Sequence, residues 1–147
     1  MNFRLIANTT SYVLWVEAGF LLLPLLVSVL YGEPWMPFFA TAVLCILIGF
    51  ILQLVPVKKA QMHSRDGFMA VALGWIALSL TGALPYVFSG ALNDYVDAIF
   101  ETVSGLTTTG STVFPEVEHL HRSVLLWRSL TQWMGGMGVL VLFLALT

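Results

Sequence analysis

The stretch "SGLTTTGSTVFP", residues 104–115, places four threonines, two serines and two glycines inside a chain that is otherwise strongly apolar. A run of this kind is too short and too polar to cross a bilayer. Irregular backbone at membrane depth is tolerated only where protein or a water-filled cavity surrounds it. The stretch therefore predicts either a re-entrant loop inside a membrane protein or an ordinary solvated turn, and the flanking segments decide between the two.

The composition identifies an integral membrane protein. Of the 147 residues, 59% are hydrophobic and 10% are charged, and the mean hydropathy is +0.91. A chain of this kind is too apolar for a water-soluble domain of its size. The formal net charge of -2 leaves no basic surface for nucleic acid, and the single Cys45 excludes a disulfide framework within the chain.

Four apolar stretches each supply the roughly 20 residues that a spanning helix needs. We predict spanning helices at about residues 11–31, 37–57, 67–88 and 123–147. Glu17 lies about two turns inside the first of them. An ionisable group at this depth is either a functional residue or, as we expect here, a side chain that snorkels toward the cytoplasm. A removable signal peptide is the alternative for this first stretch, but Glu17 and Pro24 interrupt its apolar core.

Basic residues predict the orientation, because short loops rich in lysine and arginine stay in the cytoplasm. Lys58, Lys59 and Arg65 lie between the second and third stretches, which places this connection inside. The charged residues of the connection at 89–122 are mostly acidic, so this connection is expected outside. Both chain ends then lie in the cytoplasm.

The segment "NDYVDAIFETVSG", residues 93–105, predicts a short helix of about three turns in front of the hydroxyl-rich stretch, because its apolar residues recur at helical spacing. Asn93 or Asp94 is the predicted N-cap, and Gly105 is predicted to end the helix. Spanning helices flank this region on both sides. We therefore expect residues 95–114 to dip into the membrane from outside without crossing it.

The chemistry of the hydroxyl-rich stretch suits a monovalent cation. Backbone carbonyls and threonine hydroxyls can replace the water shell of such an ion, and a short helix that ends at the loop adds the negative end of its dipole. Gly110 lets the chain turn its carbonyls inward, because glycine adopts conformations that are closed to threonine. The stretch therefore predicts an ion-selectivity filter rather than a surface turn.

Two motifs, "DAIFETVSGLTTTGSTVF" at 97–114 and "LLWRSLTQWMGGMGVLVL" at 125–142, closely resemble the first pore repeat of the Trk/Ktr potassium transporters. The segment "SRDGFMAVALGWIALSLTGALPYVF", residues 64–88, resembles the helix that leads into this repeat. The two N-terminal stretches are similar, more weakly, to the extra hairpin of the Trk branch.

The resemblance implies an all-α integral membrane fold. Residues 1–60 would form an N-terminal transmembrane hairpin, and residues 61–147 the first pore repeat of potassium-channel type. That repeat would consist of a transmembrane helix, a pore helix with a re-entrant filter loop at 94–114, and a second transmembrane helix. In the family, four such repeats in one chain each give one wall of a potassium filter, and this sequence holds one of them.

The resemblance also implies the function and the site. Thr108 and Thr109 would coordinate K⁺, and Thr107, Gly110 and Ser111 would complete the loop. The chain would be the N-terminal part of a potassium uptake transporter in the bacterial inner membrane, with K⁺ as the transported ion and no further cofactor. A second copy of the chain and a cytoplasmic nucleotide-binding regulatory subunit would be its partners. The alternative is a small cation channel in which four identical chains assemble.

Charged residues near the loop are candidates for supporting it. Asp94, Asp97 and Glu101 can line a mouth that attracts cations, and the two aspartates equally suit the first turn of the pore helix. Arg128 can neutralise Glu101 or the carbonyls at the end of the pore helix. These four residues are therefore predicted to serve the vestibule or to hold the pore helix in place.

His119 and His121 do not predict a metal site. Residues spaced i and i+2 do not share a helix face, and no third ligand is fixed nearby. No nucleophile motif or metal-ligand spacing indicates an enzyme either. Three glycines in the last span are predicted to let two helices approach closely, and a flexible joint is the alternative. They are Gly135, Gly136 and Gly138.

Overall fold

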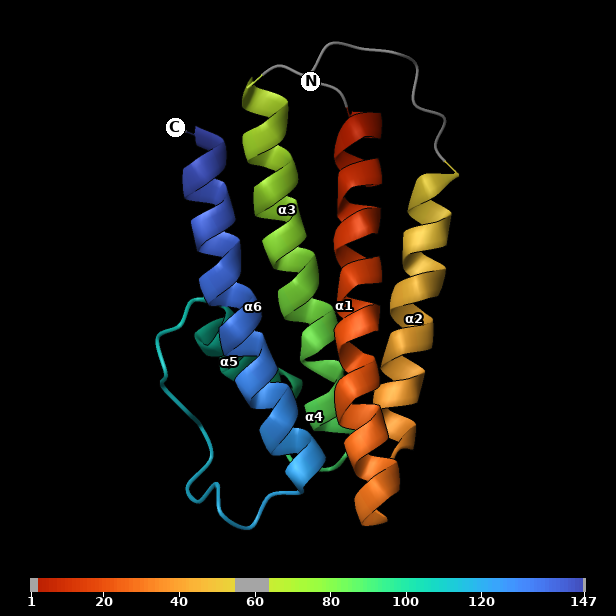
Figure 1. Cartoon of the computed structure of the whole chain (residues 1–147), viewed down its shortest axis with the longest axis vertical. Helices are drawn as coiled ribbons and strands as arrows, with labels where there is room; N and C mark the ends of the chain where they lie inside the picture. The colour runs from red at the N-terminus through yellow and green to blue at the C-terminus, as the bar shows by residue number, and fades with distance from the viewer. Residues whose placement is uncertain (1–2, 55–63, 147) are drawn as a thin grey trace.

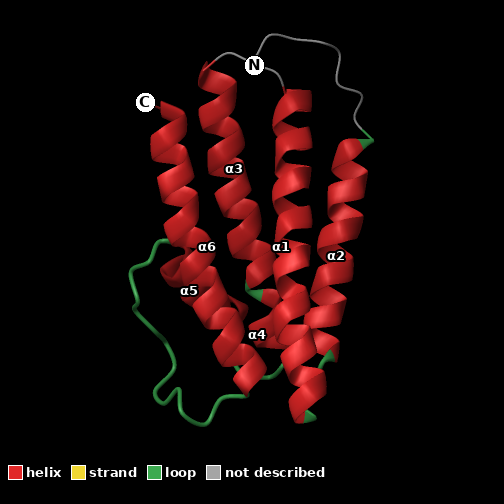
Figure 2. Cartoon of the chain, in the orientation of Figure 1, coloured by secondary structure: helices red, strands yellow, loops and turns green. Residues whose placement is uncertain are grey.

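Long helices run side by side, and a short helix with a long loop lies beside one half of the bundle (Figure 1). The computed structural model describes residues 3–54 and 64–146. These residues form helices and loops and contain no strand (Figure 2). In chain order the helices are α1 (Phe3–Tyr31), α2 (Met36–Gln53), α3 (Ser64–Gly82), α4 (Leu84–Phe88), α5 (Tyr95–Leu106) and α6 (Arg122–Leu146).

Among the described residues, three segments are long and apolar enough to cross a membrane: Ile6–Tyr31, Met36–Gln53 and Asp66–Phe88. They confirm the first three predicted spans, although α1 begins at Phe3, well before the predicted start. The fourth predicted span corresponds to the backbone of α6, whose side chains are described only as far as Gly138. Membrane crossing by α6 therefore stays a prediction.

The third span is broken near its end. Helix α3 ends at Gly82, and α4 begins at Leu84 after the single residue Ala83. Pro85 lies in the first turn of α4, where a missing N–H costs no helical hydrogen bond, whereas a helix continuing from α3 would need that N–H. The indole of Trp127 in α6 donates to the Gly82 carbonyl at 2.9 Å. The break is thus tied to α6.

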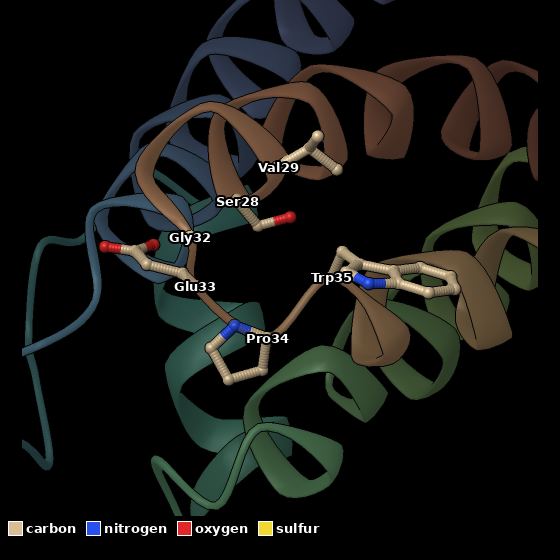
Figure 3. Close-up of a pocket in the computed structure, with 6 residues that line it drawn as sticks. All are labelled: Ser28, Val29, Gly32, Glu33, Pro34 and Trp35. Atoms are coloured by element: carbon tan, nitrogen blue, oxygen red, sulfur yellow. The ribbon is translucent and has the colours of Figure 1, made fainter.

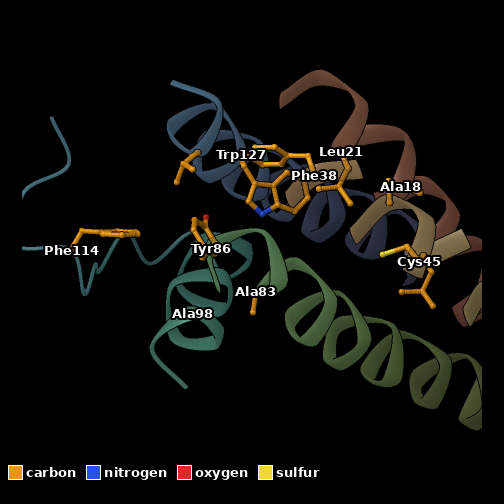
Figure 4. Packing of buried hydrophobic residues seen from close by; sticks show 12 residues of the cluster. Ala18, Leu21, Phe38, Cys45, Ala83, Tyr86, Ala98, Phe114 and Trp127 are labelled. Carbon is orange, nitrogen blue, oxygen red and sulfur yellow. The ribbon is translucent and has the colours of Figure 1, made fainter. Parts of the chain in front are cut away.

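The buried core joins the first two helices to α4, α5 and α6 (Figure 4). Trp127 of α6 and Tyr86 of α4 are its largest members, and both have no exposed surface. Leu21 of α1 and Phe38 of α2 belong to the same cluster and are equally buried. Many large apolar side chains on the outer helix faces remain exposed, as lipid contact requires.

The start of α1 and the end of α6 lie at the same end of the bundle, while the loop after α5 extends to the other end (Figure 1). This arrangement fits the prediction that both chain ends face one side of the membrane. Lys58 and Lys59, on which the predicted orientation rests, lie outside the described residues, as does the side chain of Arg65. The orientation therefore stays a prediction.

Candidate functional site

Helix α5 is the predicted pore helix, and Asp94 is its N-cap. Asp94 has an extended backbone, with φ of -97° and ψ of 128°, and its side chain accepts a hydrogen bond from the Val96 N–H at 2.9 Å. This satisfies one of the N–H groups that the start of a helix leaves without a partner. Asp97 lies in the first turn, where the helix dipole favours a carboxylate. Asp94, rather than its neighbour Asn93, therefore starts the helix.

Gly105 does not end the pore helix, so that prediction is wrong. Helix α5 continues through Leu106, and Thr107 is the C-cap residue. Gly105 is buried, and a Cβ at this position would lie 3.1 Å from the Cβ of Thr131 in α6. The missing side chain therefore serves the close packing of α5 on α6 rather than a turn.

Gly135 allows a second close approach between the same two helices. A Cβ at Gly135 would lie 2.6 Å from the carbonyl carbon of Leu106, closer than real Cβ atoms come to such an atom. At Gly136 and Gly138 a Cβ would make only ordinary van der Waals contact. The predicted close approach of helices is thus confirmed at Gly135, where α6 meets the end of α5.

The predicted filter residues lie in the segment that follows α5, which we call the Thr-rich loop (residues 107–113). Thr108 has a φ of 56° and Gly110 a φ of 79°, both in the left-handed region. The special conformation predicted for Gly110 is confirmed. Thr108 was not expected there, because a β-branched residue rarely adopts a positive φ. Two left-handed residues around Thr109 give the loop a path that is neither helix nor strand.

The start of the Thr-rich loop is fixed to the end of α5. The N–H of Thr108 donates to the Gly105 carbonyl at 2.9 Å, and the N–H of Thr109 donates to the Ser104 carbonyl at 3.0 Å. The side chains at 107–111 are all exposed in this chain. The first five residues of the loop are therefore exposed and begin from a fixed attachment to α5.

Side-chain hydroxyls add further contacts within this region. The Thr107 hydroxyl donates to the Val103 carbonyl at 2.8 Å and lies 2.8 Å from the Thr109 hydroxyl. The Ser104 hydroxyl donates to the Ser111 carbonyl at 2.5 Å. Thr107 therefore shapes the turn, and the Ser111 carbonyl already has a partner within the chain.

Glu101 of α5 holds the far side of the Thr-rich loop against this helix. Its carboxylate accepts hydrogen bonds from the Thr112 hydroxyl at 2.9 Å and from the Val113 N–H at 3.1 Å. The Arg128 side chain of α6 forms an ion pair with the same carboxylate, which is the contact predicted for it. Glu101 is 2% exposed, so these charged and polar partners replace water around it.

Phe114 ends the loop in the hydrophobic core. It is 7% exposed, and its ring lies 6.1 Å from that of Tyr86, measured between centroids. Figure 4 shows both residues at the side of the cluster where the loop arrives. The Thr-rich loop is thus held at its start by α5, along its return by Glu101, and at its end by the core.

Sequence reasoning did not assign roles to Thr112, Val113 or Ser104. Thr112 and Ser104 belong to the hydroxyl-rich stretch, and this position was the one feature of the sequence that could have indicated their contacts. The Val113 contact uses a backbone N–H, so its residue type carries no signal. Glu33, in the turn between α1 and α2, was also missed because its partners lie about 90 residues away.

Glu33 caps the start of α6. Its carboxylate accepts the N–H groups of Arg122 and Ser123 at 2.8 and 2.9 Å and the Ser123 hydroxyl at 2.6 Å. Partial burial opposes ionisation, but these hydrogen bonds and His121, 3.9 Å away, lower the pKa of Glu33 below its usual value. The turn between α1 and α2 is therefore held against the start of α6.

A pocket of about 570 Å³ lies at this turn and is lined by Ser28, Val29, Gly32, Glu33, Pro34 and Trp35. Figure 3 shows the Glu33 carboxylate pointing away from the Trp35 ring. None of the lining residues belongs to the Thr-rich loop. The pocket is therefore a feature of the hairpin turn, separate from the candidate filter.

His119 and His121 take different acidic partners. His119 lies 3.1 Å from Glu116 on the surface, while His121 faces Glu33. Among the described residues, no group of three histidine, cysteine, aspartate or glutamate side chains is arranged to hold a metal ion.

Glu17 does not snorkel toward the membrane surface, so that prediction is wrong. It is 1% exposed, and its carboxyl group lies 2.6 Å from the Thr81 hydroxyl of α3. The physical reason is the early start of α1 at Phe3, which places Glu17 near the middle of the helix rather than near its end. From there the side chain reaches neighbouring helices and not the aqueous phase.

Comparison with known families gives a match over most of the chain. The TrkH family model, described as "Cation transport protein", matches residues 35–146. The chain belongs to the TrkH family of cation transport proteins. This membership confirms the resemblance seen in the sequence, and with the apolar helices it identifies a multi-pass membrane protein.

Individual relatives of this TrkH-family chain are named as potassium uptake proteins or as a cation transporter. The chain is 38% identical to the Trk system potassium uptake protein TrkH of Salmonella typhimurium, covering 99% of this chain and 31% of the relative. It is 40% identical to an uncharacterized cation transporter of Methanocaldococcus jannaschii, covering 84% of this chain and 26% of the relative. The family consists of transporters rather than enzymes.

The fold is that of a solved member of the family. The crystal structure of the potassium transporter TrkH from Vibrio parahaemolyticus superposes with a TM-score of 0.92 at 35% identity. The match covers 99% of this chain and 32% of the solved chain. This TrkH-family chain therefore spans about a third of the length of the relatives it matches, and the match confirms the predicted all-α membrane fold.

Proposed function

We propose that the chain is the N-terminal part of a Trk-type potassium uptake transporter and supplies one of four walls of a potassium-selectivity filter. The observation that carries the proposal is the Thr-rich loop, which leaves the buried C-terminal end of α5 and turns through two left-handed residues. Membership of the TrkH family and the names of the relatives support the choice of potassium as the ion.

Thr108 and Thr109 are the proposed ion-coordinating residues. Their exposed side chains and carbonyls lie just beyond the end of α5, where the negative end of the helix dipole favours a cation. Gly110 turns the chain and Thr107 braces it through its hydroxyl. Ser111 completes the loop through its contact with Ser104.

Four charged residues have the proposed task of supporting the loop. Asp94 and Asp97 hold the start of the pore helix and add negative charge at its mouth. Glu101 and Arg128 hold the return of the loop against α5 and α6. The filter geometry would therefore depend on an ion pair that does not itself touch the ion.

The remaining assignments concern the whole transporter. We place it in the bacterial inner membrane with both ends of this chain in the cytoplasm. Residues 1–60 serve as the N-terminal hairpin and 61–147 as the first pore repeat. A second copy of the transporter and a cytoplasmic nucleotide-binding regulatory subunit are the proposed partners, by analogy with the family. Three further repeats would complete the filter.

A homotetrameric channel built from four copies of this chain is the second candidate. One filter sequence per chain is what such an assembly needs. The relatives are about three times as long as the matched region, and this favours the single-chain transporter. Growth in low potassium separates the two candidates: this chain alone rescues uptake-deficient cells only if four copies assemble.

The direct test of the filter assignment is Gly110→Val in the full-length transporter. A valine at φ of 79° is strained by on the order of 1 to 3 kcal/mol, and the loop is expected to relax by moving its carbonyls. Rubidium uptake should lose its discrimination against sodium while the protein still reaches the membrane.

Gly90→Val is the matched control, because Gly90 also has a positive φ, of 73°, and open space around it, but lies outside the Thr-rich loop. It should leave the discrimination between rubidium and sodium intact. Unchanged discrimination in well-expressed Gly110→Val would show that the loop is a surface turn.

A further inference from the structure

A carboxyl group lies inside the helical bundle and takes no part in the candidate filter. Glu17 of α1 is 1% exposed. Its Oε2 atom lies 2.6 Å from the Thr81 hydroxyl oxygen of α3 and 3.7 Å from the Cys45 sulfur of α2. Glu17 of α1 thus contacts both α2 and α3, and each of these three helices contains a candidate membrane span.

The two short contacts of the Thr81 hydroxyl indicate whether the Glu17 carboxyl group carries a proton. The Thr81 hydroxyl also lies 2.7 Å from the Ala77 carbonyl oxygen, one turn earlier in α3. A hydroxyl has one hydrogen to donate, and a backbone carbonyl has none. If Thr81 donates to Ala77, the hydrogen between Glu17 and Thr81 has to come from Glu17. Both short contacts are satisfied when Glu17 is protonated.

Among the side chains that the structure describes, no positive charge is paired with Glu17. Within the described part of the chain its carboxyl group takes part in no salt bridge, and its contacts on α2 and α3 are a thiol and a hydroxyl. Ionised groups without a partner are costly in the interior of a membrane protein, and a buried acid avoids that cost by keeping its proton.

The other side of Glu17 faces the break between α3 and α4. A Cβ at Gly82 would lie 3.1 Å from the Glu17 Oε1 atom, 2.9 Å from the Thr102 methyl group of α5 and 3.5 Å from the Trp127 ring of α6. None of these neighbours is charged. Trp127 also holds the Gly82 carbonyl. Glu17 therefore lies where the hairpin, the helix break and the pore helix meet.

We propose that Glu17 is a proton-binding site, held as a neutral carboxylic acid that donates to Thr81 and fixes α1 to the end of α3 beside the pore helix. The ligand is a single proton, and its binding does not depend on which ion the protein transports. The site joins helices of the hairpin and of the pore repeat.

Infrared difference spectroscopy tests the proposal on the full-length protein that carries this chain, in lipid at neutral pH. The spectrum of the wild type minus that of Glu17→Gln should show the carbonyl stretching band of a protonated carboxylic acid. Glu17→Gln keeps a hydrogen-bond donor toward Thr81, so the variant is expected to fold. The matched control Glu118→Gln alters an exposed glutamate and should show only the loss of carboxylate bands.

Thr81→Val is the second probe and serves also if Glu17→Gln fails to fold. It removes the acceptor of the proposed hydrogen bond, so the carboxylic acid band should shift in frequency. Loss of carboxylate bands alone in Glu17→Gln, or an acid band that does not respond to Thr81→Val, would overturn the proposal. Neither readout measures transport, so failure here leaves the proposed function standing, and the reverse also holds.

Discussion

Glu17 and Glu101 are both glutamates within the helical bundle, 1% and 2% exposed, yet their surroundings differ completely. Glu101 has the Arg128 side chain, a hydroxyl and a backbone N–H as partners. Glu17 has the Thr81 hydroxyl and the Cys45 thiol, neither of them charged. Burial alone therefore does not determine whether a carboxyl group is charged. The charge depends also on the partners around the group.

The two glutamates also act on different parts of the molecule. Glu101 receives four contacts from three donors and ties the return of the Thr-rich loop to α5 and α6. Glu17 ties the first hairpin to the break after α3. Glu101, with its ion pair, holds the loop that we propose binds the ion. Glu17, which we propose is neutral, holds α1 against α3.

Replacing Glu101 by glutamine is expected to have the largest effect. It leaves the mostly buried Arg128 without a counter-charge, and breaking a buried ion pair from one side costs about 3 kcal/mol or more. The Thr-rich loop also loses its strongest acceptor. In the full-length protein the thermal unfolding midpoint in detergent should fall, and rubidium uptake should lose its discrimination against sodium.

Glu17→Gln is the matched change at the other buried glutamate and serves as the control. A neutral amide resembles a neutral acid in shape and still donates a hydrogen bond, so the unfolding midpoint should change far less. An equal fall of the unfolding midpoint in Glu101→Gln and Glu17→Gln would contradict the view that Glu101 is charged and Glu17 neutral.

Glu33 gives a smaller effect that appears only in acid. Because its pKa is lowered in the folded protein, its contribution to stability is present above its ordinary pKa of 4.5 and is lost as the pH falls through the lower folded value. The helix cap it provides is worth about 1 kcal/mol. The wild type should therefore lose more stability below about pH 4.5 than Glu33→Gln does, as measured by thermal unfolding in detergent.

Glu118→Gln is the comparison for that measurement, because Glu118 also lies in a loop but is exposed. Its acid dependence should match the wild type. An identical acid dependence in Glu33→Gln and the wild type would show that the cap on α6 is not energetically important.

Local signals in the sequence predicted much of the fold. The length of apolar stretches gave the first three spans, and the periodicity of 93–105 with a capping aspartate gave α5. The unusual backbone of Gly110 was predicted from its position among threonines and is confirmed. Each of these features depends on residues close together in the chain.

Features that depend on distant partners were missed or wrong. Gly105 looked like a helix terminator, but its role is set by Thr131 of another helix. Glu17 was predicted to snorkel, and the prediction is wrong because neither the early start of α1 nor the position of Thr81 can be inferred from the residues next to Glu17 in the sequence. The ion-binding roles of the Thr-rich loop stay predictions, since the described residues form one wall of the proposed filter.

The central claim is that the Thr-rich loop lines an ion site, and anomalous scattering tests it most directly. Crystals of the full-length transporter soaked in thallium or rubidium should show an anomalous peak against the carbonyl and hydroxyl oxygens of Thr108 and Thr109, and sodium should not displace it. Anomalous peaks elsewhere in the protein, with none beside these two residues, would contradict the assignment.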